Sequence, residues 1–400
     1  MKHLLSIAGH QEELVSFLES TGEKPYRARQ IYRWIYHTVP FAGSFEMMTD
    51  LPSELRRRLS ENFYITSLEV TSKLASRDGT VRYNFLSKRN QGRKVEFPAV
   101  FIPSPSGKRN TVCLSTQAGC PVGCLFCASG GTFERNLTKG EIIESYLLIA
   151  GDIRARSKKD TGAEDKNTRR KAGVLFMGSG EPFLNYENLI FTLKDMISEM
   201  GLGAGNIVLS TVGIPDGAIK KFTREFCLRH DDDKVKGDGG SFKVRLAVSL
   251  HTADDRLRKE LIPVKGLPAV DAILEDAFGY AFATKTRLTI ECVMIKGITD
   301  TEEQVVLLAD TVKKHINKSR YPDVVVNLIP FNNNARGKEN GFFAPDGKSV
   351  VAVKNFLISR GIFTIIRLNR GEDISGACGQ LEPGGFFTGE SLDSLKIKRC

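Results

Sequence analysis

Long apolar runs are what this 400-residue sequence most plainly lacks. No run reaches the roughly 20 residues that a membrane-spanning helix needs. The apolar run near the N-terminus, in MKHLLSIAGHQEEL, is too short for a signal peptide, and acidic residues follow it at once. We therefore expect a cytoplasmic protein that makes no membrane contact.

Paired cysteines with the spacing of a zinc site are scarce as well. The chain has eight cysteines, but Cys124 and Cys127 form its only C-x2-C pair. A structural zinc site usually takes four protein ligands from two such pairs, so this class of site is poorly matched. Cysteines clustered in one stretch instead indicate a reducing compartment, which agrees with a cytoplasmic location.

An excess of acidic residues is also absent. Lysine and arginine number 57 against 47 aspartates and glutamates, a net charge of +10 with a pI near 9.1. This balance suits a polyanionic partner such as RNA, although it is spread over the whole chain. With 41% apolar residues, the chain has enough of them to fill a sizeable core.

The densest chemical signal lies between residues 111 and 127, in TVCLSTQAGCPVGCLFC. Cys120, Cys124 and Cys127 have a C-x3-C-x2-C spacing, and three thiolates so close together can hold one iron–sulfur cluster from a single loop. A 4Fe–4S cluster has four irons, so three cysteines leave one iron open for chemistry, as in catalytic metal sites. A zinc knuckle and unligated cysteines are the alternatives to this interpretation.

Residues 1–64 are predicted to form an N-terminal helical accessory domain. Apolar residues fall on one face in YRARQIYRWIYH, and Asp50 and Glu54 suggest the start of a second helix, with Asp50 as its N-cap. A group of arginines makes this segment basic: Arg27, Arg29, Arg33 and Arg56–Arg58. A solvated helix face explains these charges as well as an RNA contact does.

Short alternating runs follow from 65 to 108 and predict a β-hairpin linker element with a turn at Arg77-Asp78-Gly79. From 109 to 383, strands and helices then alternate, which indicates a parallel sheet covered by helices. We expect six strands, at 111–116, 173–178, 206–211, 243–250, 287–295 and 324–331.

Six such units predict an incomplete α/β barrel, in which ligands gather at the C-terminal ends of the strands. The cysteine loop follows the first strand, where a barrel would place it. Polar stretches at 154–171 and 229–241 are predicted to be exposed loops, and 384–400 a loose tail.

Several motifs together resemble one family. The cysteine triplet, with an aromatic residue before its last member, resembles the radical S-adenosylmethionine (SAM) superfamily. Further stretches are similar to the RlmN/Cfr family of RNA adenine methyltransferases, from about residue 24 to 381: CLSTQAGCPVGCLFC, GSGEPFLNY, LSTVGIPDG, VSLHTADDRLR, NLIPFN and RGEDISGACGQL. The resemblance implies an α/β fold with a partial (βα)6 radical SAM barrel, an N-terminal helical accessory domain and a small β element.

The resemblance also assigns residues to cofactors. It implies that Cys120, Cys124 and Cys127 bind one 4Fe–4S cluster. The residues that it implies for SAM are Gly180, Glu181, Ser210, Ser249, Leu250, His251 and Asn332. A carboxylate such as Glu181 could hold the SAM amino group by a charge-assisted hydrogen bond, and the less favoured alternative is a helix-entry residue before Pro182.

The chemistry implied by the resemblance uses two further cysteines. An adenine C–H carbon and the SAM methyl group are both electrophilic, so direct displacement between them fails. Cys378 matches a cysteine that first takes a methyl group from SAM, and a radical from a second SAM then activates that methyl group for addition to the base. Cys113 matches the thiol that releases the product, which leaves a transient disulfide with Cys378.

The residue that would remove the ring proton is less well matched. Glu96 occupies the strand where the family has a glutamate, but two extra residues separate it from the following Ile-Pro turn, and Pro98 lies within that strand. Cys227, Cys292 and Cys400 receive no role.

The resemblance implies methylation of adenine carbon 2 in 23S ribosomal RNA, transfer RNA or both. An alternative with the same chemistry is carbon-8 methylation of ribosomal RNA, as in the Cfr branch. A radical SAM activase or maturase acting on a protein, an electron-transfer iron–sulfur protein and a non-catalytic RNA-binding module explain the cysteines less well. We also expect an electron donor such as flavodoxin or ferredoxin, and a monomer.

Overall fold

The computed structural model describes residues 1–7, 10–38, 40–88, 94–104, 110–161, 172–227 and 242–382. The two predicted polar stretches lie largely, and the predicted tail wholly, outside these residues. No helix in the described ranges is long and apolar enough to cross a membrane.

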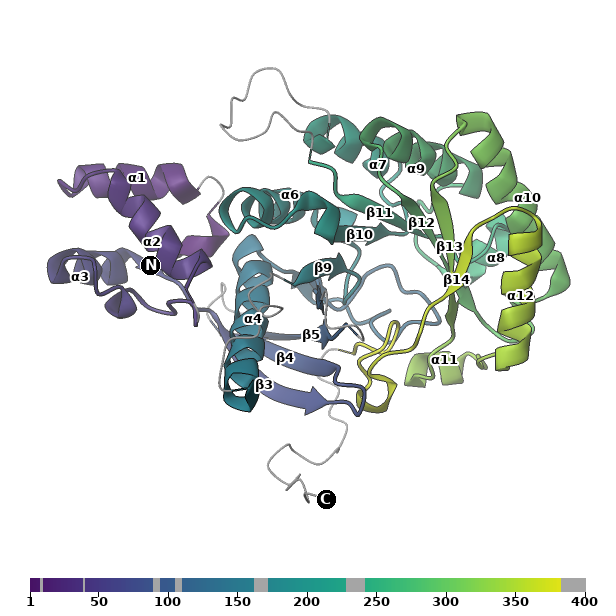
Figure 1. Cartoon of the computed structure of the whole chain (residues 1–400), viewed down its shortest axis with the longest axis horizontal. Coiled ribbons are helices and arrows are strands. Elements are labelled where there is room, and N and C mark those ends of the chain that lie inside the picture. Colours follow the sequence, from purple (N-terminus) through teal and green to yellow (C-terminus); the bar gives the residue numbers. More distant parts are fainter. Residues whose placement is uncertain are drawn as a thin grey trace.

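Small helices make up the N-terminal part, at the end of the molecule opposite α10 and α12 (Figure 1). They are α1 (His10–Ser20), α2 (Tyr26–Tyr36) and α3 (Ser53–Asn62), with short 3-10 turns at Leu4–Ser6 and Phe45–Met47 and a two-stranded pair of β1 (Lys2–His3) and β2 (Phe63–Tyr64). The helices predicted around residues 24–37 and 50–63 are thus confirmed.

Asp50 is not the N-cap that the sequence predicted. Helix α3 begins at Ser53 after Pro52, and Asp50 instead accepts hydrogen bonds from Arg33 Nη2 (2.7 Å) and Trp34 Nε1 (2.6 Å) on α2. A proline at the helix entry already fixes φ there, so the Asp50 carboxylate is free to bind α2. Its effect is to join α2 to the segment that leads into α3.

One ten-stranded sheet organises the rest of the described chain. Its strands in spatial order are β14 (Thr364–Ile366), β13 (Val324–Pro330), β12 (Leu288–Met294), β11 (Arg245–Ser249), β10 (Ile207–Thr211), β9 (Gly173–Phe176), β6 (Thr111–Cys113), β5 (Val95–Ile102), β4 (Val81–Ser87) and β3 (Leu68–Ala75). Strands β6 and β9–β14 pair in parallel, as in a partial barrel, and β3–β6 pair antiparallel.

Four details of the strands were not anticipated. The small β element extends the main sheet through β5 and β6, and a seventh parallel strand, β14, follows the six predicted ones. Pro98 does not interrupt β5: this strand pairs with β6 only from Val100 onward, so the missing N–H of Pro98 is not needed on that side. A separate two-stranded pair, β7 (Gln117–Ala118) and β8 (Arg135–Asn136), flanks the cysteine loop.

Helices cover the outer face of the parallel strands, as Figure 1 shows. They are α4 (Lys139–Thr161), α6 (Tyr186–Lys194), α7 (Ala218–Phe222), α9 (Val270–Thr284), α10 (Glu302–Ser319) and α12 (Gly347–Ser359). Two short helices, α8 (Asp255–Leu261) and α11 (Ala335–Glu339), lie against the cysteine loop. Short π-helical or 3-10 turns occur at Asp195–Glu199, Thr223–Cys227, Pro182–Asn185, Ala204–Asn206 and Glu372–Ile374.

Helix α4 runs further than predicted. Residues 154–161 belong to it, although the sequence predicted a loop from 154 onward. An i,i+4 ion pair of Asp152 with Arg156 (3.1 Å) continues the helix on its solvent side. A stretch rich in charged residues was therefore not a reliable sign that this helix ends.

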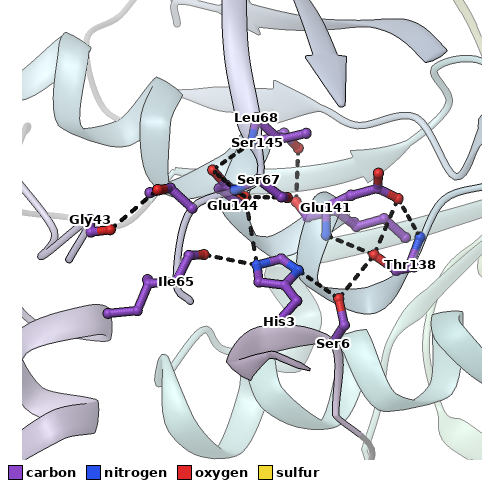
Figure 2. A network of polar contacts seen from close by, with 12 residues as sticks. His3, Ser6, Gly43, Ile65, Ser67, Leu68, Thr138, Glu141, Glu144 and Ser145 are labelled. Carbon is purple, nitrogen blue, oxygen red and sulfur yellow. Dashed lines mark hydrogen bonds and ion pairs between the residues drawn. The ribbon is translucent and has the colours of Figure 1, made fainter. Parts of the chain in front are cut away.

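A buried polar network joins the first residues of the chain to α4 (Figure 2). Glu144 is fully buried and accepts hydrogen bonds from Ser67 N (2.9 Å), Ser67 Oγ (2.8 Å) and Leu68 N (3.0 Å). His3 Nε2 donates to Ile65 O (2.8 Å) and lies 3.7 Å from Glu144. The network fixes the N-terminal helices to the first helix of the barrel.

Glu144→Ala should therefore destabilise the protein more than an exposed substitution does. It leaves buried donors of Ser67 and Leu68 without acceptors, and we expect the free energy of unfolding to fall by about 3 kcal/mol. Urea denaturation followed by circular dichroism measures this loss. Glu187→Ala, at an exposed position of α6, is the control and should change stability by less than about 0.5 kcal/mol.

Candidate active site

The cysteine loop is held in place through its backbone. Leu125 N donates to Leu261 O (3.0 Å) at the end of α8, and Ala128 N donates to Gly379 O (2.8 Å) near the end of the chain. Arg336 on α11 donates to the carbonyl oxygens of Cys124 and Gly123, both at 3.0 Å. Because these bonds use backbone groups, the three cysteine side chains need not support the loop themselves.

All three thiols line one cavity at the C-terminal ends of the parallel strands. The same cavity is lined by most of the residues predicted to bind SAM, together with Cys378: Gly180, Glu181, Ser210, Ser249, His251 and Asn332. We call it the cluster cavity. Leu250 does not line it, because its side chain is fully buried in the main hydrophobic core.

Glu181 is nearly fully buried and its carboxylate has three partners. It accepts from Phe183 N (3.0 Å), Thr211 Oγ1 (2.7 Å) and Val212 N (2.9 Å). The first bond caps the turn at Pro182–Asn185, so the helix-entry role considered from the sequence is present. Burial raises the pKa of Glu181 to about 7. A carboxylate has about four acceptor sites, so one remains for a ligand cation.

Two strand ends beside Glu181 carry small polar groups and a histidine. Ser210 Oγ and Ser249 Oγ lie 3.0 Å apart, and His251 Nδ1 accepts from Val293 N (3.3 Å). Burial lowers the pKa of His251 to about 3, so its ring is neutral at physiological pH. The ring packs edge-on against Phe126 of the cysteine loop.

Asn332, two residues after the end of β13, is the last of the residues predicted to bind SAM. Its Nδ2 donates to Cys378 O (2.9 Å), while its Oδ1 is buried without a hydrogen-bond partner among the described residues. A buried acceptor without a partner is costly and marks a place where a ligand donor would fit.

A second cavity adjoins the cluster cavity, and Cys378 lines both. Cys113, Leu175, Ile102 and Ala377 line only the second one, while Arg367 and Asn332 also line both. Burial, and then the nearby Cys378, raise the pKa of Cys113 to about 12. All seven cysteines within the described residues are free, so the disulfide implied by the resemblance is not formed there.

Sequence reasoning missed an ion pair between the two cavities. Arg367, just after β14, lies 3.6 Å from the buried Glu291 of β12, which also accepts from Asn327 Nδ2 (2.7 Å). Cys378 and then Glu291 raise the pKa of the Arg367 guanidinium above its usual value. Charged residues within the apolar stretches RLTIECVMI and FTIIRL were the signal that could have identified this pair.

Glu96 lines neither cavity. It is half-buried on β5, on the same face as Ile102 of the second cavity, because side chains alternate along a strand. It lies four residues from Val100, the partner of Cys113 in the sheet, which is about 13 Å along the strand. A role as general base stays a prediction for this residue.

The cluster cavity fits an iron–sulfur cluster and SAM. Cys120, Cys124 and Cys127 all line one cavity. Within the described residues, no group of His, Cys, Asp and Glu side chains is arranged to hold a single metal ion. A cluster suits such a set, because each thiolate binds a different iron. The buried Asn332 Oδ1 and the spare acceptor site of Glu181 suit the amino acid part of SAM.

Comparisons with known proteins agree with this geometry. Residues 7–65 match the family model described as the ribosomal RNA large subunit methyltransferase N-terminal domain, and residues 114–309 match the radical SAM superfamily. A probable dual-specificity RNA methyltransferase RlmN from Endomicrobium trichonymphae is 40% identical over 365 residues, which cover 90% of this chain and 91% of the relative.

Two further similarities cover nearly the whole chain. The dual-specificity RNA methyltransferase RlmN of Anaeromyxobacter dehalogenans is 34% identical over 94% of this chain and 91% of its own. A crystal structure of a radical SAM methyltransferase from Sphaerobacter thermophilus superposes with a TM-score of 0.76 at 32% identity, over 95% of this chain and 99% of the other.

Proposed function

The chain belongs to the RlmN family of dual-specificity radical SAM RNA methyltransferases, and from this premise we propose that it methylates carbon 2 of an adenine in 23S ribosomal RNA, transfer RNA or both. The observation that carries the proposal is the position of Cys378, which lines both the cluster cavity and the cavity of Cys113. A methyl group carried on this sulfur would face the cofactors on one side and the resolving thiol on the other.

The two cysteines divide the chemistry between them. The sulfur of Cys378 displaces the methyl group of a first SAM: a sulfur–carbon bond forms, the sulfonium–carbon bond breaks, and the thiol proton is lost. Arg367 lines both cavities together with Cys378 and places a positive charge near this sulfur. Cys113 stays protonated because of its raised pKa, so it does not compete for the methyl group.

Radical chemistry comes from the cofactors: a cluster bound by Cys120, Cys124 and Cys127 would supply the electron that cleaves a second SAM reductively. Glu181 and Asn332 would hold the amino acid part of SAM, and Ser210, Ser249 and His251 would surround it. Gly180 and Leu250 would contribute backbone groups. Once the adduct of the base with the methylene carbon on Cys378 has lost one electron, which the cluster would accept, and its ring proton, the Cys113 thiol gives up its proton and attacks the Cys378 sulfur. The disulfide bond forms as the carbon–sulfur bond breaks, and the departing carbon keeps the electron pair and takes up a proton to become the methyl group of the RNA.

The N-terminal helices offer a surface for the RNA. Tyr26, Arg29, Arg33 and His37 follow one another along an exposed face of α2, and together with residues of the turn at Asp195–Glu199 they line a groove. Cationic and aromatic side chains on one face suit phosphates and unstacked bases. We also propose a cytoplasmic monomer that receives electrons from flavodoxin or ferredoxin.

Carbon 8 is the alternative target, and the RlmN names of the curated relatives support carbon 2 over it. Anaerobic reaction of the reconstituted protein with methyl-deuterated SAM and total RNA tests the proposal. Nucleoside mass spectrometry should detect 2-methyladenosine with a labelled methyl group. Labelled 8-methyladenosine instead would assign the enzyme to the Cfr branch, and unlabelled RNA throughout would contradict both.

A further inference from the structure

One buried cation beside the cluster cavity has no role in the chemistry above. Arg258 on α8 is 1% exposed, and its guanidinium donates only to backbone carbonyl oxygens at the ends of strands and loops. These acceptors are Val212 O (2.8 Å), Leu250 O (3.1 Å), Pro268 O (3.3 Å) and Ser249 O (3.5 Å).

No carboxylate pairs with Arg258. Among the described residues, no aspartate or glutamate oxygen lies within the 4.0 Å of an ion pair with its guanidinium, whereas Lys139, the fully buried lysine of α4, has Asp195 at 2.7 Å. Carbonyl dipoles satisfy the hydrogen bonds of a guanidinium but do not cancel its charge. A buried cation of this kind calls for negative charge nearby.

The cysteine loop, which lies against α8, supplies negative charge once its thiolates bind a cluster. Helix α8 packs on this loop: Leu257 and Leu261, on either side of Arg258, belong to one apolar cluster with Cys120, Cys124 and Cys127, and Leu261 O accepts from Leu125 N. Burial lowers the pKa of Arg258 to about 10, and Cys124, Asp255 and Glu181 oppose that shift, Cys124 most strongly.

We propose that Arg258 is the fixed counter-charge of the iron–sulfur cluster and that it raises the cluster's reduction potential. The inference rests on the binding of the cluster by Cys120, Cys124 and Cys127. Reduction adds one negative charge to a cluster that already carries thiolates, and a buried cation at short range stabilises the reduced form more than the oxidised one. Carbonyl bonds on every side of the guanidinium hold this charge in place.

Arg258→Gln removes the charge and retains an amide donor of similar reach. After anaerobic reconstitution, we expect this variant to have the iron and sulfide content of the wild type. Its cluster should have a more negative midpoint potential, which redox titration with electron paramagnetic resonance detection measures. The control is Lys139→Gln. Lys139 is a fully buried cation on α4 that donates to Asp195 (2.7 Å) and Ile7 O (2.8 Å), and it lines neither cavity. Its loss should leave the potential unchanged.

Arg258→Lys provides a second readout should the glutamine variant bind no cluster. A buried lysine can lose its proton, so the potential of this variant should fall further below that of the wild type as pH rises, and recover as pH is lowered. An iron-loaded glutamine variant with the wild-type potential, or a lysine variant whose difference from the wild type does not change with pH, would overturn the role of Arg258. Wild-type protein that binds no iron would instead overturn the cluster assignment.

Discussion

Cys113→Ala protein purified from cells is expected to carry covalently bound RNA that survives denaturation, while Cys378→Ala protein and the double variant carry none. Without the thiol of Cys113, the methylated base stays joined to Cys378 through the new methylene carbon, because a thiolate must reach the Cys378 sulfur to break that bond. Among the described cysteines, only Cys113 shares the second cavity with Cys378.

Denaturing gel electrophoresis followed by nuclease digestion and mass spectrometry of the Cys378 peptide measures the adduct. We expect it on a large fraction of Cys113→Ala molecules and at background in the others. The matched control is Cys292→Ala, which removes a cysteine that is fully buried in β12 and lines neither cavity. Cys113→Ala protein that is free of RNA and fully active would show that Cys113 only packs in its strand.

The second large effect concerns the cluster itself. Cys124→Ala is expected to lose almost all cluster iron after anaerobic reconstitution, and with it the reductive cleavage of SAM. The fold should persist, because Arg336 binds the carbonyl oxygen of residue 124 and not its side chain. Iron analysis and visible absorption measure the loss, and thermal unfolding checks the fold.

A control for this loss is Cys227→Ala, which removes a buried thiol that contacts Tyr280 (3.6 Å) and is remote in sequence from the loop. It should retain its full iron content. The assignment of the three ligands is wrong if the triple variant of Cys120, Cys124 and Cys127 still binds a cluster and cleaves SAM.

Much of the barrel could be predicted because its strands are long apolar runs separated by helices with clear apolar faces. Strand β14 was missed since it has only three residues and Ile365 is 41% exposed, as expected at a sheet edge. The end of α4 was missed for a different reason: residues 154–161 are rich in charge and yet belong to the helix. Local composition did not distinguish a solvated helical turn from a loop.

The site was partly predictable for a related reason. Residues at the ends of parallel strands gather at one edge of the sheet, and the cysteine loop, Glu181, Ser210, Ser249, His251 and Asn332 do line one cavity there. Contacts between distant segments were harder to predict, because a local pattern can mark a buried charge but does not say which residue it contacts. The Arg367–Glu291 pair joins β12 to the segment after β14, and Leu250 turns its side chain into the core although it adjoins two cavity residues.

Arg82 has a consequence for the order in which the protein matures. Its side chain on β4 binds the carbonyl oxygens of Ser375 and Glu382, which are 293 and 300 residues further along the chain. A ribosome adding about 5–20 residues per second needs roughly 15–60 s to make that stretch. The cysteine loop likewise waits for Gly379, whose carbonyl oxygen accepts from Ala128 N. The cysteine loop is thus closed last, by the segment that carries Cys378. We therefore expect an unfinished chain to leave its three loop cysteines open to iron and sulfide, and to lack the proposed methyl acceptor Cys378 until that segment has been made.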